Sequence, residues 1–397
     1  MLEVFGMTLL ERQLHSIASA GLAPTAIHVA LAPGTPAVSS LRERLNARFP
    51  VQWSSDPASL YERIVRLLNE GPEQPILVCQ ADSVIDTRLL AFLAAQRGTL
   101  AACGGEGNAR AAVLRLDGPL SLTGNVEGNL TRLVDLGIAQ GAITELPLDS
   151  IPSYIKKLRR DFPVYLFGVP DEAGRDQAER FLFWSNYKGS TDFFTKYVYP
   201  PVVWRMVRPL AGWRVHPNTI SIFNIAITFL AVPLFACGWW WTGFFFAYTM
   251  SVLDSVDGKL ARLTFTSSSL GDILDHGLDI VHPPFWYFGW AWGLSAGDTA
   301  SPVFQAALWM AALYVLDRIV AGAFNRRLRR SIHGYTSLDE RLRTIISRRN
   351  INLPIFLVGW ILGVPVQTFL LLVLWQLICF VFHVERLVQF WNHQKAV

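Results

Sequence analysis

The sequence predicts two domains: an N-terminal α/β domain, Rossmann-like with a mostly parallel sheet, and a C-terminal all-α membrane domain of six transmembrane helices. The chain of 397 residues is too long for one ordinary hydrophobic core. Hydrophobic residues make up 51% of it, and the 14 Trp and 25 Phe are typical of a membrane protein. The long apolar runs begin near residue 218, whereas the first 185 residues have the composition of a soluble domain.

The first 150 residues alternate between strand-like and helical patterns. Strand-like runs occupy 26–32, 75–81, 111–117 and 142–148, and helical patterns lie at about 7–20, 57–70, 86–97 and 127–140. Such alternation is typical of an α/β domain whose sheet is mostly parallel. Residues 151–187 are expected to link this domain to the membrane part near the membrane surface, because they carry Lys156, Lys157, Arg159 and Arg160.

Six apolar segments are candidate transmembrane helices. They lie at about 218–238, 242–261, 273–295, 303–322, 352–366 and 367–385. The connections after the first, third and fifth contain no Lys or Arg. The connection between the fourth and fifth carries Arg326, Arg327, Arg329, Arg330, Arg341, Arg343, Arg348 and Arg349. Because positive residues favour the cytoplasmic side, we expect an inner-membrane protein with both termini and the active site, at the aspartate stretch 254–279, on the cytoplasmic side.

Residues 188–217, before the first span, mix aromatic and basic side chains, and no run among them is long enough to span. They are expected to form an interfacial amphipathic helix, and Pro217 is expected to start the next helix. The start of the chain lacks the basic and apolar regions of a signal peptide. The cysteines Cys79, Cys103, Cys237 and Cys379 have no CxxC spacing, which argues against a disulfide framework or a zinc site.

The stretch 254–279, DSVDGKLARLTFTSSSLGDILDHGLD, places aspartates next to membrane-length segments. Intramembrane carboxylates are costly and usually mark function. On helices, the spacing puts carboxylates and glycines on two narrow faces. The first face holds Asp254, Asp257, Gly258 and Ala261, and the second holds Gly271, Asp275 and Asp279. The polar residues between Arg262 and Gly271 allow a tight hairpin, so the two faces can meet.

Four clustered carboxylates cannot all stay ionised without cations. Hard divalent ions such as Mg²⁺ take oxygen ligands and add phosphate oxygens to their shell. The glycines leave room for a bulky group, and Arg262 is placed for a phosphate or a carboxylate. The stretch therefore predicts metal-assisted phosphoryl transfer. The alternative is that single aspartates cap helices, as Asp272 is expected to do, or pair with the arginines of 326–349, but it explains neither the glycines nor the spacing.

These residues match D-x2-D-G-x2-A-R-x8-G-x3-D-x3-D, and residues 188–390 resemble the CDP-alcohol phosphotransferase (CDP-alcohol phosphatidyltransferase) family. The resemblance implies transfer of a substituted phosphate from a CDP-alcohol to an alcohol, with release of CMP, in phospholipid biosynthesis. It implies Mg²⁺ or Mn²⁺ as two ions, with Asp279 as the catalytic base. The implied metal ligands are Asp254, Asp257, Asp275 and Asp279. The implied nucleotide-binding residues are Asn218, Gly258, Ala261, Arg262 and Gly271.

The acceptor site has two candidate residues, Arg318 and His276, while His282 flanks the motif and is expected to be structural. Arg318 would hold an acceptor phosphate or pair with Asp317. The run SSSLGDILDHGLD is similar to the choline and ethanolamine branch, whereas the fused soluble domain and the arginine-rich loop are similar to the inositol-phosphate branch. The implied partners are a CDP-alcohol donor and an alcohol acceptor, at least one of them a lipid, with no nucleic acid. Dimers in the family suggest a homodimer.

The N-terminal domain resembles a sugar-phosphate nucleotidyltransferase. MLEVFGMTLLERQLHSIASAGL is similar to the segment after that family's phosphate loop, and ILVCQAD is similar to the strand that ends in its metal-binding Asp, here Asp82. We expect a degenerate domain, because the glycine-rich phosphate loop is not found before this point. Asp82 is then expected to be a helix N-cap or a loop residue. The alternatives for the whole chain are a bifunctional cytidylyltransferase/CDP-alcohol phosphotransferase and a non-catalytic membrane scaffold.

Overall fold

The structure is a computed structural model, and it describes the chain except for a few residues. Those outside the description are 1, 32–38, 56–57, 72–73, 124–125, 127, 157, 190, 329–330, 335 and 394–397, and the side chains of 272, 275, 276, 337, 392 and 393. The chain divides into two compact units. Unit 1 comprises Met1–Ile155 and Asp161–Ser185, and unit 2 comprises Lys156–Arg160 and Asn186–Val397.

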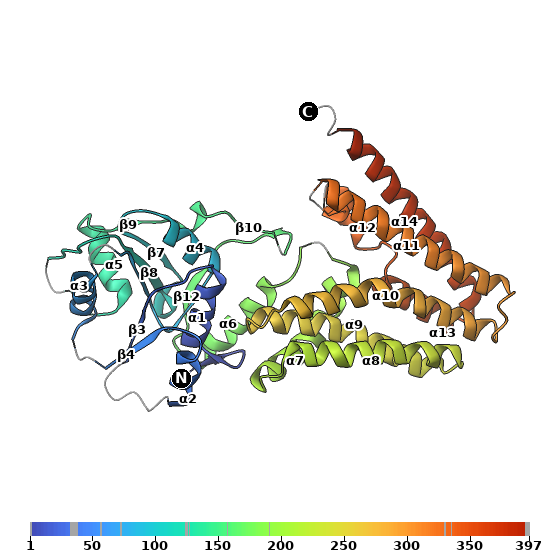
Figure 1. The fold of residues 1–397 in the computed structure, drawn as a ribbon, viewed down its shortest axis with the longest axis horizontal. Helices are drawn as coiled ribbons and strands as arrows, with labels where there is room; N and C mark the ends of the chain where they lie inside the picture. The colour runs from blue at the N-terminus through green and yellow to red at the C-terminus, as the bar shows by residue number, and fades with distance from the viewer. Residues whose placement is uncertain are drawn as a thin grey trace. The chain divides into compact units, whose positions relative to one another are not determined.

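Unit 1 is a mixed α/β unit (Figure 1). Its helices are α1 (Leu9–Ser19), α2 (Ser39–Asn46), α3 (Leu60–Glu70), α4 (Thr87–Ala95), α5 (Leu130–Ala139) and α6 (Glu172–Ser185). Its main sheet has the order β5 (Ile76–Cys79), β8 (Ala111–Leu116), β7 (Leu100–Gly104) and β9 (Thr144–Glu145). Smaller pairs join β1 (Glu3–Val4) to β2 (Met7–Thr8), β3 (Ile27–Ala30) to β4 (Val51–Ser54), and β6 (Ser83–Ile85) to β12 (Leu166–Gly168).

The expectation of a mostly parallel sheet is wrong. Strand β8 runs antiparallel to both β5 and β7, and β9 is the parallel neighbour in this sheet. Residues 105–110 alone connect β7 to β8, and this is too short for the crossover that parallel strands need. Gly105 makes the tight connection possible, because its φ is +73° and a Cβ there would collide with the carbonyl of Ala109.

Strand β8 is buried along its whole length, because helices pack on both faces of the sheet (Figure 1). Leu114 packs with residues of α3 and α5 on one face. Val113 packs with residues of α4 on the other. Helix α6 also belongs to unit 1, although it lies within the predicted linker: Glu179 accepts a hydrogen bond from the Phe5 amide at 2.9 Å.

Unit 2 is helical. Its helices are α7 (Pro200–Gly212), α8 (Pro217–Ala236), α9 (Trp240–Leu263), α10 (Ser269–Leu294), α11 (Pro302–Leu328), α12 (Ser337–Arg343), α13 (Arg349–Ile361) and α14 (Pro365–His393). The six predicted spans fall on α8, α9, α10, α11, α13 and α14. Among the described residues, three helices are long and apolar enough to cross a membrane: Pro217–Ala236, Pro302–Leu328 and Pro365–Trp391. The structure therefore supports a helical membrane region, and the count of six spans stays a prediction.

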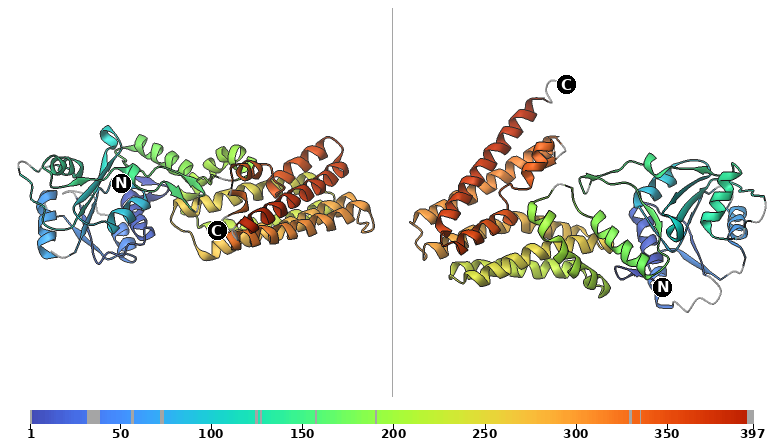
Figure 2. Two further views of the ribbon diagram at one scale, coloured as in Figure 1. Left: turned by 90° about the horizontal axis from the view of Figure 1, so that it is seen from above. Right: turned by 180° about the vertical axis from the view of Figure 1, so that it is seen from behind.

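Helices α8, α9 and α10 lie side by side, and α11 packs on α10 and α14 (Figure 2). Aromatic side chains fill the interior, where Trp290 stacks on Phe356 with ring centroids 4.2 Å apart. Within the predicted amphipathic segment, α7 follows a π-helical turn at Phe194–Val198. The expected helix start at Pro217 is confirmed, and His216 caps it by accepting a hydrogen bond from the Asn218 amide.

Candidate active site

The two motif helices end at the same place because a short turn joins them. Helix α9 ends at Leu263 and α10 begins at Ser269. Phe265 turns the chain with a φ of +53°, and Ser268 caps α10 by accepting a hydrogen bond from the Gly271 amide at 3.0 Å. Asn218, in the first turn of α8, lies beside this cap, with its Oδ1 3.4 Å from the Ser268 hydroxyl. Three helix ends therefore meet at the turn between the two halves of the motif.

Asp257 is held from α8. One of its carboxylate oxygens accepts a hydrogen bond from the Ser221 hydroxyl at 2.6 Å. The other accepts from the Gly258 amide at 2.6 Å. The residue is 6% exposed, and hydrogen bonds to a buried carboxylate stabilise its charged form and fix its direction. Ser221 was not identified from the sequence, because its position one turn after Asn218 carries no distinctive signal.

Asp254 and Asp279 are brought together by one arginine. Arg349 forms an ion pair through Nη2 with Asp254 Oδ2 and through Nη1 with Asp279 Oδ1, the latter at 2.6 Å. The arginine is the first residue of α13 and is buried, whereas the side chain of Asp279 is 48% exposed. The pairing with an arginine of 326–349, raised as an alternative from the sequence, is thus present for these two aspartates. It shows that the carboxylates from α9 and α10 share a small volume that requires positive charge.

The donor set can be tested against a divalent metal. Asp254 and Asp257 from α9 and Asp279 from α10 offer hard carboxylate oxygens, which are the ligands that Mg²⁺ and Mn²⁺ prefer. Among the side chains that the structure describes, no group of three His, Cys, Asp or Glu lies close enough to hold a metal. The fourth predicted ligand, Asp275, and the acceptor candidate His276 belong to α10, but their side chains lie outside the description. The residues fit a divalent cation by donor type and charge.

The two motif glycines differ in the space around them. A Cβ on Gly271 would come within 3.2 Å of both Asn218 Oδ1 and Ser268 Oγ. A Cβ on Gly258 would lie 3.4 Å from Nη1 of Arg262. Any side chain at 271 would therefore push against the Asn218–Ser268 pair, whereas a Cβ at 258 would make only an ordinary van der Waals contact with the Arg262 guanidinium. Ala261, the other predicted nucleotide-binding residue, is half-buried on the same helix.

Arg318 forms an ion pair with its neighbour Asp317 in α11. Its Nη2 lies 2.8 Å from Asp317 Oδ2, and the second Asp317 oxygen contacts Nδ1 of His383 from α14. The Arg318 guanidinium lies over the ring of Tyr314, whose hydroxyl donates to the backbone carbonyl of Asp279 at 2.8 Å. The ion-pair alternative is therefore present, and it places Arg318 one side chain away from the backbone of Asp279.

His282 is fully buried, as a structural histidine would be. Its Nδ1 contacts the Leu278 carbonyl at 2.6 Å, and its ring lies against Trp286.

The arginines of 326–349 differ in how deeply they are buried. Arg326, Arg327 and Arg341 are exposed, but Arg343 and Arg349 are buried. Arg329 and Arg330 lie outside the described residues. Sequence reasoning could not separate these groups, because burial here depends on how the short helix α12 and the start of α13 pack.

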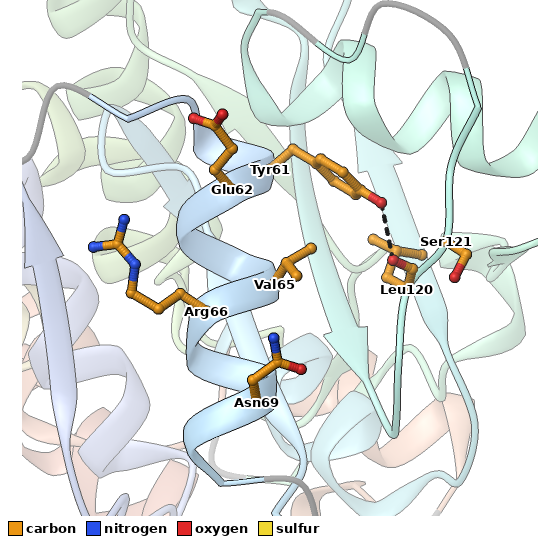
Figure 3. Close-up of a pocket in the computed structure, with 7 residues that line it drawn as sticks. All are labelled: Tyr61, Glu62, Val65, Arg66, Asn69, Leu120 and Ser121. Carbon is orange, nitrogen blue, oxygen red and sulfur yellow. Dashed lines mark hydrogen bonds between the residues drawn. The ribbon is translucent and has the colours of Figure 1, made fainter.

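Unit 1 holds none of the motif residues. Asp82 lies in an exposed turn between β5 and β6, and the N-cap of α4 is Asp86 instead. A cavity of about 450 Å³ lies between α3 and the segment at Leu120 (Figure 3). Tyr61 spans it, donating a hydrogen bond to the Leu120 carbonyl at 3.0 Å.

Comparison with known proteins points to one family for the helical unit. Residues 214–393 match the family model described as CDP-alcohol phosphatidyltransferase. An uncharacterized CDP-alcohol phosphatidyltransferase class-I family protein of Schizosaccharomyces pombe is 27% identical over 25% of this chain and 30% of its own. Cholinephosphotransferase 1 of Rattus norvegicus is 36% identical over 18% of this chain and 21% of its own. The chain thus spans less than a third of the length of these relatives.

Among solved structures, phosphatidylinositol phosphate synthase of Mycobacterium tuberculosis with CDP-DAG bound aligns with a TM-score of 0.37. The alignment has 18% sequence identity and covers 48% of this chain and 93% of that one. This likeness is too distant to support an argument about the fold or the site.

Proposed function

Because residues 214–393 carry a CDP-alcohol phosphatidyltransferase domain, we propose that the protein is a membrane transferase of phospholipid biosynthesis. It moves a substituted phosphate from a CDP-alcohol to an alcohol acceptor and releases CMP. The observation that carries this proposal is the ion pair of Arg349 with both Asp254 and Asp279, because it joins the two halves of the motif in space. The intact aspartate motif argues against the scaffold alternative.

In the proposed reaction, the acceptor hydroxyl attacks the β-phosphorus of the CDP-alcohol. A bond forms between this oxygen and phosphorus, the bond from phosphorus to the bridging oxygen of CMP breaks, and the hydroxyl proton passes to a carboxylate oxygen of Asp279. The half-exposed position of Asp279 leaves it accessible to an acceptor. The hydrogen bonds from Ser221 and the Gly258 amide would keep Asp257 ionised and oriented throughout.

Asp254, Asp257, Asp275 and Asp279 would hold two divalent ions, Mg²⁺ or Mn²⁺. Bound there, the metal would neutralise the diphosphate charge that develops as CMP leaves. Asn218, Gly258, Ala261, Arg262 and Gly271 would lie along the nucleotide, and the position of Asn218 beside Gly271 supports this. Arg349 would then exchange its carboxylate partners for substrate oxygens or remain on Asp279 as an orienting group.

For the substrates, a CDP-linked head group with a lipid acceptor is the first pair to test, because the named relatives include cholinephosphotransferases. The reverse pair, a CDP-lipid with a small polar acceptor, is favoured by Arg318. This arginine retains donors beyond its bond to Asp317 and would bind an acceptor phosphate together with His276. The protein would sit in the inner membrane with the site and both termini in the cytoplasm, and would form a homodimer.

Radiolabelled CMP release decides the proposal. The purified full chain is given CDP-choline, CDP-ethanolamine or CDP-diacylglycerol with a panel of lipid and polar alcohols, with Mg²⁺ or with EDTA. Acceptor-dependent and metal-dependent CMP release by the wild type, lost in Asp257→Asn, is the expected result. No release with any pair would reject the proposed reaction.

Unit 1 is proposed to be a degenerate nucleotidyltransferase-like domain that docks or regulates. The exposed turn position of Asp82 and the different N-cap residue give no support for a metal-binding role there. The bifunctional alternative predicts pyrophosphate release from CTP and a phosphorylated alcohol by the full chain. Detecting that release would replace the degenerate-domain proposal.

A further inference from the structure

A buried arginine at the end of α12 has no hydrogen-bond or ion-pair partner among the residues that the structure describes. Arg343, the last residue of α12, is 8% exposed. It makes no hydrogen bond or ion pair with any residue that the structure describes, and its Nε is shielded from solvent. An ionised side chain buried without a partner is strongly unfavourable, so such groups are normally paired or bind a ligand.

The surroundings of Arg343 are positively charged. Burial and the guanidinium groups of Arg348, Arg159 and Arg318 lower the pKa of Arg343 well below its usual value, and Asp192 opposes them only in part. The carboxylate of Asp192 already accepts hydrogen bonds from other residues. Its oxygens accept hydrogen bonds from the Thr195 amide and hydroxyl, both at 2.9 Å, and from Asn350 at 3.2 Å.

Arg348 is a second guanidinium without a carboxylate within ion-pair distance among the described residues. Its Nη2 lies 3.2 Å from Nε2 of the buried His333, while its Nε is buried and unbonded. The neighbouring arginines differ in this respect, because Arg318 is paired with Asp317 and Arg349 with Asp254 and Asp279. The local excess of positive charge therefore belongs to Arg343 and Arg348.

The segment 158–160 adds a third guanidinium to this place. Arg159 is a non-glycine residue with a φ of +53°, a conformation that costs energy and often marks a functional position. Its Nη1 is 3.5 Å from the hydroxyl of Ser331, on the connection that leads to α12. The segment is held there, because the Gly189 amide donates to the Leu158 carbonyl at 2.9 Å and a Cβ on Gly189 would lie only 2.7 Å from the Arg159 carbonyl oxygen.

We propose that Arg343, Arg348 and Arg159 form a phosphate-binding site that includes none of the motif aspartates. Guanidinium groups bind phosphate oxygens in pairs, and three of them suit a group with several oxygens and more than one negative charge. The phosphate can come from the head group of an anionic lipid or from a soluble phosphate ester. Its binding would also fasten the segment 158–160 to α12.

Phosphate-dependent stability of the full chain in detergent tests the site. The melting temperature is measured in sodium phosphate and in sodium chloride at equal ionic strength, because a ligand of the folded state stabilises by RT ln(1 + [L]/Kd). A second arm compares nanodiscs of phosphatidylcholine with nanodiscs that contain phosphatidic acid. We expect phosphate to raise the melting temperature, and phosphatidic acid to do so in addition if the natural source is a lipid.

Substitutions of single arginines test which residues bind the phosphate. Arg343→Gln and Arg348→Gln should each weaken phosphate affinity at least tenfold, whereas Arg341→Gln, on the exposed face of the same helix, should retain it. Arg343→Lys keeps the charge without the paired donors, and serves if the Gln variants do not fold. The proposal is overturned if neither phosphate nor phosphatidic acid stabilises the wild type beyond the chloride or phosphatidylcholine control. It is equally overturned if a folded variant at 343 responds as the wild type does. No nucleotide is present, so the outcome is independent of the proposed transfer reaction.

Discussion

Replacing Arg349 by Gln removes the group that joins the two motif helices. The Arg349–Asp254 pair is largely buried, with side-chain exposures of 9% and 17%, and breaking such a pair costs roughly 3–5 kcal/mol. Asp279 is 48% exposed, so this half of the interaction is screened and adds at most about 1 kcal/mol. We therefore expect a loss of about 3–4 kcal/mol, taking the lower end for the first pair.

For a helical unit of this size, that loss lowers the melting temperature of unit 2 by roughly 6–16 °C. The wild type and Arg349→Gln should also differ in how strongly a divalent metal stabilises them. At the proposed metal site, a divalent ion would compete with the guanidinium for Asp254 and Asp279 in the wild type, whereas Arg349→Gln would leave these carboxylates free of that competitor. Added Mg²⁺ should then stabilise the variant more than the wild type.

The assay is thermal unfolding in detergent, followed by circular dichroism at the helical signal, in EDTA and across a Mg²⁺ series. Arg326→Gln, an exposed arginine at the end of α11, is the matched control and should behave as the wild type. Each kcal/mol lost should lower the melting temperature by about 2–4 °C. The reasoning is refuted if Arg349→Gln melts within about 2 °C of the wild type and responds to Mg²⁺ in the same way.

Three further outcomes are expected. Asp257→Asn should weaken the binding of CDP with Mg²⁺ in titration calorimetry, whereas Asp279→Asn should lower the rate of CMP release and leave binding intact. If both variants lose the same affinity, Asp279 is chiefly a metal ligand and not the base. Ser221→Ala removes one hydrogen bond to Asp257, worth about 1.5–3 kcal/mol, so kcat/KM for CMP release should fall by about 10–150-fold; an unchanged value would mean that Ser221 does not orient Asp257. Arg318→Ala should raise the KM for a phosphorylated acceptor without changing that for the donor, and a folded variant with both KM values unchanged would exclude an acceptor role.

The features that the sequence predicted well rest on local patterns. Hydropathy locates the helices of unit 2, and the spacing of Asp254, Asp257 and Asp279 identifies the faces that meet. The sheet was predicted less well, because the strand LAACG at 100–104 consists of small residues and lacks a strong strand pattern. This strand and the short connection after it make β8 antiparallel to its neighbours. Arg349 and Arg343 were two of eight arginines in one connection, and only the packing of α12 and α13 distinguishes them.

The path of the chain between the two units has a consequence for biosynthesis. Residues 156–160 belong to unit 2, yet the chain then returns to complete unit 1 with α6, whose Glu179 binds the amide of Phe5. The strand hairpin at the start of unit 1 thus lacks its contact with α6 until about 170 further residues have been synthesised, which takes roughly 10–30 s at usual elongation rates. The first candidate span starts at Pro217, soon after α6 ends at Ser185. Completion of the soluble unit and delivery of the first apolar helix to the bilayer therefore fall close together in time, so that a slow-folding variant of unit 1 would expose its core while the ribosome is engaging the membrane.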